Sequence, residues 1–117
     1  MRVIEFSQDQ AEPIRLFNSV AASSLHLGDG QGEIHLYCVF LDPGGEIGPH
    51  TAGFDQLFLV VQGAAWAAGE DGTRVAISAG KGAHFARGEV HSKGSELGAT
   101  VIMIQASDLS LKSVKVG

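Results

Sequence analysis

The side chains best suited to chemistry stand in two glycine-punctuated blocks of the sequence. In the first block, five residues separate Gly44 from His50, and Gln56 follows six positions later. In the second block, His91 closes a stretch that begins at Gly80. Imidazole nitrogen is a good ligand for transition metals, and its pKa of ~6.5 also suits it to act as a general base. The two histidines are therefore the candidate centre of a site.

The first block resembles the first motif of the cupin superfamily, which reads G-x5-H-x-H-x3,4-E-x6-G. Gly44, His50 and Gly63 fall in place. The family's second histidine is replaced by Ala52 and its glutamate by Gln56.

The second block resembles the second cupin motif, G-x5-P-x-G-x2-H-x3-N. Gly80, Gly88 and His91 match, whereas Ala86 stands for the proline and Ser95 for the asparagine. With both motifs in order, the resemblance covers the core from about residue 37 to residue 104. It implies an all-β fold, a double-stranded β-helix or jelly-roll-like barrel. It also implies a divalent metal (Fe, Mn, Ni, Zn or Cu) held by three histidines and one glutamate.

Only two of those four family ligands are present here, His50 and His91. Alanine offers no donor atom, and the neutral amide of Gln56 is a poor ligand for such metals. Catalytic metal sites commonly keep three protein ligands, so a metal would need a recruit from outside the motifs. Asp55 is a poor recruit because neighbouring side chains alternate across a strand. The cofactor expectation is accordingly none or one divalent transition metal.

The stronger recruit for a metal is His35, in the strand-like segment 34–41. If Leu41 faces the interior, Val39, Tyr37 and His35 share its face by the period-two rule. The opposite assignment buries the more uniformly apolar set of Ile34, Leu36, Cys38 and Phe40. The sequence leaves both assignments open.

A ligand pocket around the histidines would combine Gln56, Tyr37, Phe58 and Trp66. Gln56 both donates and accepts hydrogen bonds, which suits recognition, and Phe58 lies on its face of a regular strand. Trp66 stands among alanines, where core packing is the first interpretation and ligand stacking the second. His84 lies between Ala83 and Phe85, whose side chains should face inward, so it is excluded from the site.

Short strands with turns between them must position these residues. The expected strands span 34–41, 57–62, 64–68, 73–78, 83–86 and 99–105, with an Asp71-Gly72 hairpin joining the third and fourth. Gly63 marks a bend between two of them. A further hairpin is expected at 29–32, one helical turn within 10–20, and an edge strand or tail over 107–117.

Composition sets the class of the chain. Its 117 residues, 44% of them hydrophobic and 18% charged, fit one globular domain spanning 1–117, which the motif resemblance implies is a single cupin domain. The net charge of -5 without a basic cluster argues against nucleic acid as a partner. No stretch approaches the ~18 apolar residues of a membrane span, so a soluble, cytoplasmic protein that does not bind membranes is expected. The only cysteine, Cys38, is expected to be a buried thiol.

Two functions remain open from the sequence. The preferred one is a cupin of uncertain activity that binds a small molecule in the barrel, with weak or absent metal dependence. The alternative is a metal-dependent enzyme of the dioxygenase or isomerase type, with a non-standard ligand set. The resemblance further implies a homodimer formed sheet to sheet.

Overall fold

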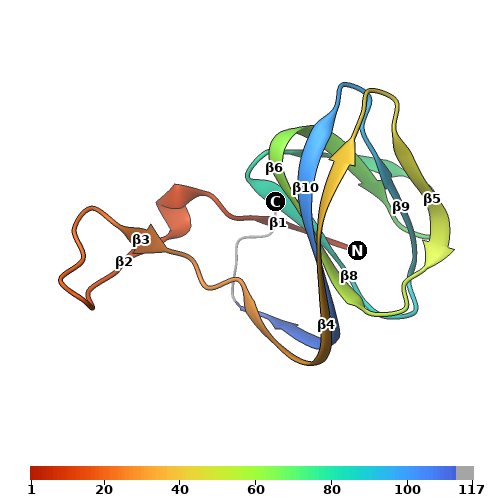
Figure 1. Cartoon of the computed structure of the whole chain (residues 1–117). Helices are drawn as coiled ribbons and strands as arrows, with labels where there is room; N and C mark the ends of the chain where they lie inside the picture. Colours follow the sequence, from red (N-terminus) through yellow and green to blue (C-terminus); the bar gives the residue numbers. More distant parts are fainter. Residues whose placement is uncertain (113–117) are drawn as a thin grey trace.

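The computed structural model describes residues 1–112 and consists almost entirely of strands (Figure 1). A short 3-10 helix, η1 (Gln8–Gln10), is the one helical element of these residues. The strands are β1 (Arg2–Glu5), β2 (Glu12–Pro13), β3 (Ser23–Ser24), β4 (Gly28–Leu41), β5 (Glu46–Thr51), β6 (Asp55–Ala68), β7 (Arg74–Ser78), β8 (Lys81–Phe85), β9 (Val90–Gly94) and β10 (Ala99–Leu111).

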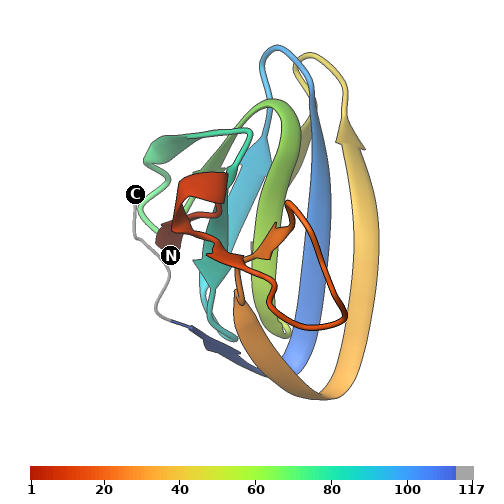
Figure 2. The same ribbon diagram turned by 90° about the vertical axis from the view of Figure 1, so that its left-hand side faces the viewer.

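The strands form two layers that share β6. One layer has the order β1-β8-β6-β10-β4, and in the other β6 pairs with β7 and β9, while β9 pairs with β5. Every pairing is antiparallel. Strands β4 and β10 run side by side over most of their length, as Figure 2 shows. The architecture is the all-β, jelly-roll-like arrangement expected from the two motifs.

Gly63 is where β6 passes from one layer to the other. Before it, β6 pairs with β8 and β10; after it, β6 pairs with β7 and β9. Its φ of +81° is in the left-handed region, and a Cβ there would lie 2.3 Å from the carbonyl oxygen of Gly98. The sequence placed the bend correctly but predicted two separate strands, whereas the chain continues through it as one.

We expect Gly63→Ala to lower the free energy of unfolding by at least about 2 kcal/mol. The left-handed conformation costs an L-residue roughly 1–2 kcal/mol, and the clash with Gly98 adds to that cost. Urea unfolding measures the change. Gly48→Ala is the control, because a Cβ at Gly48 meets nothing within 4 Å. Equal stability of the two variants would contradict this account of the bend.

The main hydrophobic core lies between the two layers. It contains Leu41, Phe58, Val60, Ala65, Ala67, Ile77, Ala83, Phe85 and Val101. On β6 the inward residues are even-numbered before Gly63 and odd-numbered after it, because the bend shifts the alternation by one. A second apolar cluster, centred on Ile4, Leu57 and Leu59, covers part of the outer face of the β1-β8-β6-β10-β4 layer.

Strand β4 turns His35, Tyr37, Val39 and Leu41 toward the interior. Leu41 belongs to the main core and Val39 packs against it. The alternate residues Ile34, Leu36 and Phe40 are 50%, 70% and 73% exposed on the outer face. The less uniformly apolar face is thus the inner one. The expectation that Cys38 is buried was wrong, because Cys38 lies on this outer face and is exposed.

Three local expectations need correction. Residues 29–32 form no hairpin: Gly32, at φ +86°, lies inside β4, where the pairing with β10 shifts register. A glycine of positive φ serves a bulge as well as a turn. The helical turn expected within 10–20 lies earlier, at η1, and residues 12–24 instead form the β2–β3 hairpin. Over 107–117 the tail alternative is wrong for residues 107–111, which belong to β10 and fit the edge-strand alternative; positions 113–117 lie outside the described residues.

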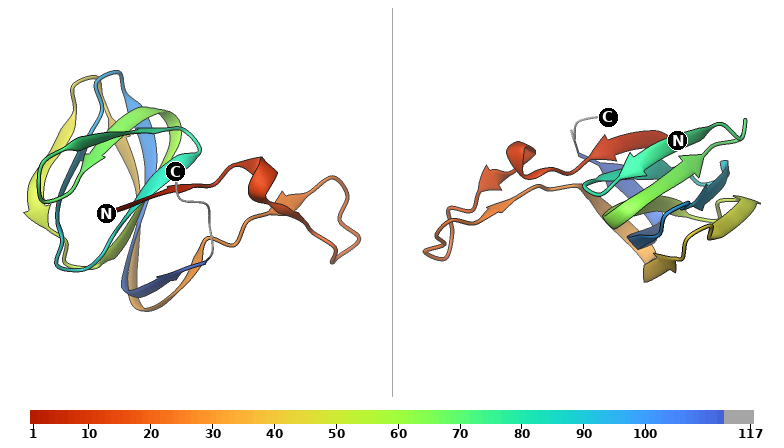
Figure 3. Two further views of the ribbon diagram at one scale, coloured as in Figure 1. Left: turned by 180° about the vertical axis from the view of Figure 1, so that it is seen from behind. Right: turned by 90° about the horizontal axis from the view of Figure 1, so that it is seen from above.

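The β2–β3 hairpin projects away from the rest of the molecule (Figure 3). Only two residue pairs join its strands, and the molecule reaches 46 Å in its longest dimension. The tip exposes Leu16, Phe17 and Val20 at 65%, 89% and 86%. We call residues 12–24 the arm.

Within residues 1–112, no helix has the length and apolar character needed to cross a membrane.

Candidate functional site

His50 and His91 come together, as their motif positions imply. They are paired across β5 and β9, and their ring centroids are 4.4 Å apart. His50 is exposed, with Nδ1 donating to the carbonyl oxygen of Gly48 at 2.8 Å. His91 is fully buried, and neither ring nitrogen has a hydrogen-bond partner among residues 1–112. One imidazole of the pair therefore faces solvent and the other faces the interior.

Lys93 is the residue that sequence reasoning missed. It lies on β9 two positions after His91, hence on the same face of the strand, and is 1% exposed. Its Nζ lies 3.7 Å from the Sδ of Met103 and over the rings of Phe58 and Phe85, at 5.7 and 5.5 Å. Among the described residues no carboxylate forms an ion pair with it. The period-two rule applied to β9 would have placed it in the interior.

Burial changes the protonation of both interior groups. Desolvation lowers the pKa of the Lys93 ammonium group to about 8. Desolvation also lowers the pKa of His91, to about 3, and the charges of Lys93 and His50 lower it further in the same direction. At neutral pH the interior therefore holds a neutral imidazole beside a buried, mostly protonated amine.

Gln56 lies in the interior on β6, as expected from the motif. It is 2% exposed, shares the inward face with Phe58, and is paired in register with Phe85 and Gln105 of the neighbouring strands. Its Nε2 has no hydrogen-bond partner. Buried amides are almost always hydrogen-bonded, so the Nε2 of Gln56 requires an acceptor that the described residues do not provide.

His35 and Tyr37 face inward on β4 but stand apart from the histidine pair. His35 Nε2 lies 2.5 Å from Oε2 of Glu33, and its ring makes an edge contact with Phe54 at 5.4 Å. Tyr37 stacks beside His35 at 6.5 Å and is 47% exposed. Both rings are partly exposed, His35 at 39% and Tyr37 at 47%, so solvent reaches them.

Trp66 does not line the interior. Ala65 and Ala67 belong to the main core, so Trp66 between them points to the opposite side of β6. There its ring lies against Gly94 and beneath the guanidinium of Arg74, 3.8 Å from the ring centroid. The Gly63 bend is the physical reason, since it reverses which residues of β6 face inward.

Asp55, which precedes Gln56, and Ser95 of the second motif have structural roles. Asp55 accepts hydrogen bonds from the backbone N–H groups of Arg87 and Leu109, at 2.9 and 3.1 Å. Ser95, at the position of the family asparagine, donates to the carbonyl oxygen of Ala64 and accepts from the N–H of Gly98. The Asp55 contacts join the start of β6 to the β8–β9 loop and to β10, and the Ser95 contacts hold Gly98 beside the Gly63 bend.

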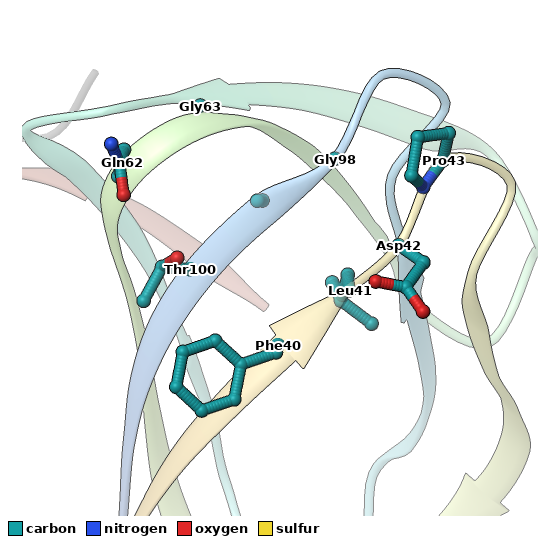
Figure 4. A pocket seen from close by; sticks show the side chains of 9 residues that line it. Phe40, Leu41, Asp42, Pro43, Gln62, Gly63, Gly98 and Thr100 are labelled. Carbon is teal, nitrogen blue, oxygen red and sulfur yellow. The ribbon is translucent and has the colours of Figure 1, made fainter.

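Two surface hollows have linings that include neither His50 nor His91. The groove of Figure 4, about 320 Å³, is formed where β4, β6 and β10 approach their turns, and its lining includes Phe40, Pro43 and Thr100. Asp42 is its only ionisable side chain, so it lacks a nucleophile and base pair. A second hollow lies beside Trp66 and Arg74. Neither provides the chemistry that the interior histidines offer.

The interior donor set does not fit a divalent cation. Within residues 1–112 no three of the His, Cys, Asp and Glu side chains stand close enough to hold one, so His35 does not complete a set with His50 and His91. Ala52, buried at 3% exposure, occupies a family ligand position without a donor atom. The buried ammonium group of Lys93 acts electrostatically on His91 and would repel a metal bound there.

The two layers, the shared strand and the paired histidines define a protein of cupin fold. Among solved structures, a cupin superfamily protein from Desulfitobacterium hafniense is similar with a TM-score of 0.60 at 14% identity, over 92% of this chain and 100% of that one. A cupin-2 domain protein from Shewanella frigidimarina is similar with a TM-score of 0.55 at 19% identity, over 78% and 85% of the two chains.

A third similar structure, from Thermotoga maritima, is described as a predicted oxalate decarboxylase. It matches with a TM-score of 0.54 at 21% identity, over 66% of this chain and 65% of that one. No family model matches the sequence, and no curated protein matches it. At these identities the likeness establishes the fold, and the activity has to be argued from the site.

Proposed function

We propose that this protein binds a small organic molecule inside its cupin barrel, without a metal at the histidine pair. The observation that carries the proposal is the buried ring of His91, which lies against the exposed ring of His50 and has no hydrogen-bond partner in the described part of the chain. Buried polar atoms need partners, and Gln56 Nε2 faces the same deficit. A bound molecule would supply them.

The chemistry available to this site is recognition first. Gln56 orients a ligand through its amide, and the aromatic side chains of Phe58 and Phe85 form the apolar walls usual in small-molecule sites. His50 is the one imidazole of the pair that solvent reaches, so it is the group placed to exchange a proton with a ligand. The exposed, unpaired thiol of Cys38 fits the cytoplasmic location that we propose for the protein.

Metal content tests the proposal directly. We expect protein purified without a histidine tag or added metal to contain far less than one metal ion per chain by plasma mass spectrometry. The His50→Ala/His91→Ala variant is the control for metal bound at the pair. Near-stoichiometric metal in the wild type that disappears in this variant would instead support the metal-dependent enzyme.

We also propose that the protein forms a homodimer through the outer face of β4. This face presents Ile34, Leu36, Cys38 and Phe40, and Val61 of β6 adds to it at 47% exposure. No charged side chain points outward from this stretch of β4, so two acidic copies would not repel one another there. Contiguous exposed apolar surface of this kind typically marks a protein interface.

The occupant is a second copy, because the same chain carries another uncovered apolar surface. The arm projects from the outer side of this layer, where Leu25 and Leu27 join its base to the second apolar cluster (Figures 1 and 3). Its tip, with Leu16, Phe17 and Val20, touches nothing that could bury it within the described chain. In a symmetric dimer each arm can cover the apolar face of the other copy.

We expect Leu36→Lys/Phe40→Lys to shift the molecular mass measured by light scattering from dimer to monomer. A lysine pair placed within an apolar contact would leave buried charges without partners. Leu97→Lys is the matched control, since Leu97 is 82% exposed outside this face. A second variant with serine at Leu16, Phe17 and Val20 isolates the arm and should weaken the dimer. A monomeric wild type would refute the interface.

A further inference from the structure

We propose that the ligand of the barrel carries a carboxylate group, and that the buried ammonium group of Lys93 is the counter-charge that selects it. This inference rests on the proposed function, because it names the chemical class of the molecule bound at that same site. It assigns to Lys93 a role that neither cupin motif contains, since the residue falls between the motif positions of His91 and Ser95.

The surroundings of Lys93 leave most of its hydrogen-bond donors unfilled. An ammonium group has three N–H donors and no acceptor. Within residues 1–112, the only hydrogen-bond acceptor that meets Nζ is the thioether of Met103 at 3.7 Å, and thioether sulfur is a weak acceptor. The faces of Phe58 and Phe85 compensate part of the charge but fill none of the donor positions. A lysine that is 1% exposed therefore lacks a partner of opposite charge.

The polar groups that share the interior with Lys93 add further hydrogen-bond donors. Gln56 Nε2 can only donate, and a neutral His91 has one N–H donor that is also unpartnered. The interior thus holds several donors, one of them charged, and is short of acceptors. A carboxylate is acceptor-only and offers two oxygens and a negative charge, which are the features that this interior lacks.

The charge and the apolar rings of the interior exclude several other classes of ligand. A metal cation or an amine would add positive charge beside Lys93, which is unfavourable in a buried site. A neutral ligand would leave the ammonium group without a counter-charge. The rings of Phe58 and Phe85 frame an apolar environment, so the carboxylate should be attached to an apolar body and not be a small inorganic anion. The exposed ring of His50, against buried His91, marks the side from which such a molecule would approach.

Matched neutral and charged probes test the inference. Sodium acetate, butyrate, hexanoate and benzoate would be titrated into the full chain at pH 7, each beside its neutral amide, with binding followed by calorimetry. The variant is Lys93→Met, an apolar replacement of similar length. Lys112→Met is the control, because Lys112 is an exposed lysine paired with Asp29.

We expect at least one carboxylate to bind the wild type and the Lys112→Met control at least tenfold more tightly than its amide. In Lys93→Met this preference should disappear. If amides bind as tightly as carboxylates, the proposed small-molecule function stands and the inference about charge is overturned. If neither series binds, both the inference and the proposed small-molecule function are overturned. If inorganic phosphate competes equally with the organic acids, the assignment of a carboxylate on an apolar body is wrong.

Discussion

Lys93→Met is expected to raise the free energy of unfolding at pH 7 by about 3 kcal/mol. The pKa of Lys93 falls from 10.5 to about 8 in the folded protein, and each pKa unit corresponds to 1.36 kcal/mol. The folded state therefore pays to keep this amine protonated. Methionine retains most of the apolar contacts of the side chain while removing the charge, and replacing buried charges in this way is often stabilising.

The pH dependence of that gain has a definite sign. Because the folded pKa lies below the unfolded one, the unfolded chain binds more protons between pH 8 and 10.5, and wild-type stability rises with pH through this window. The loss of stability caused by the buried charge of Lys93 is fully present below about pH 8. Chemical unfolding at pH 7 and pH 10.5 should therefore show a large difference between Lys93→Met and wild type at the first pH and a small one at the second.

Lys112→Met serves as the control in the same experiment. Its side chain is 51% exposed, and substitutions at such positions usually change stability by no more than about 0.5 kcal/mol. A Lys93→Met variant no more stable than wild type at pH 7 would mean that the ammonium group has a strong partner in solution. The titrations of organic acids described above would then identify it.

His91 is expected to account for most of the loss of stability in acid. Its pKa in the folded protein is about 3, against 6.5 for an ordinary histidine, so the unfolded chain binds the extra proton between these values. The stability is fully present above pH 6.5 and is lost as the pH falls toward 3. The shift corresponds to a loss on the order of 5 kcal/mol, enough to unfold a domain of marginal stability.

In the variant His91→Leu the free energy of unfolding should fall less steeply as the pH is lowered. Its stability at pH 7 will differ from that of wild type because the packing against Phe85 changes, so the readout is the slope of unfolding free energy between pH 6.5 and 4. His26→Leu is the control, since His26 is an exposed histidine paired with Asp29. An unchanged slope in His91→Leu would show that His91 reaches solvent before the chain unfolds.

The strands and turns could be predicted because turn residues and short apolar runs are local signals, whereas the cupin fold itself was implied by the resemblance of the two motifs. The Asp71-Gly72 hairpin and the bend at Gly63 were both predicted from residue types alone, and the structure confirms them. Gly32 was misassigned because a positive φ serves a bulge and a turn equally well. The arm could not be predicted because its pairing, two residues long, leaves almost no pattern.

In the candidate site, the residues predicted correctly are those at motif positions. His50, His91 and Gln56 were found through their spacing, and the structure brings the two histidines into contact. Trp66 was expected among the ligand-binding residues but faces away from the interior. The bend at Gly63 shifts the inward-outward alternation of β6 by one residue, which turns Trp66 to the outer side. Lys93 was overlooked because a lysine in sequence reads as a solvated charge, and its burial follows only when the inward face of β9 is traced from His91.

The position of β10 imposes an order on folding. This strand lies between β4 and β6 in the finished sheet, although both precede it by many residues in the chain. Neither of them can complete its hydrogen-bonded edge until residues 99–111 have been synthesised. During translation the two longest strands before it are therefore exposed as unpaired edges, the state in which β-proteins are most prone to aggregate. Substitutions that slow the docking of β10 should consequently reduce the yield of soluble protein even where they leave the stability of the folded state unchanged.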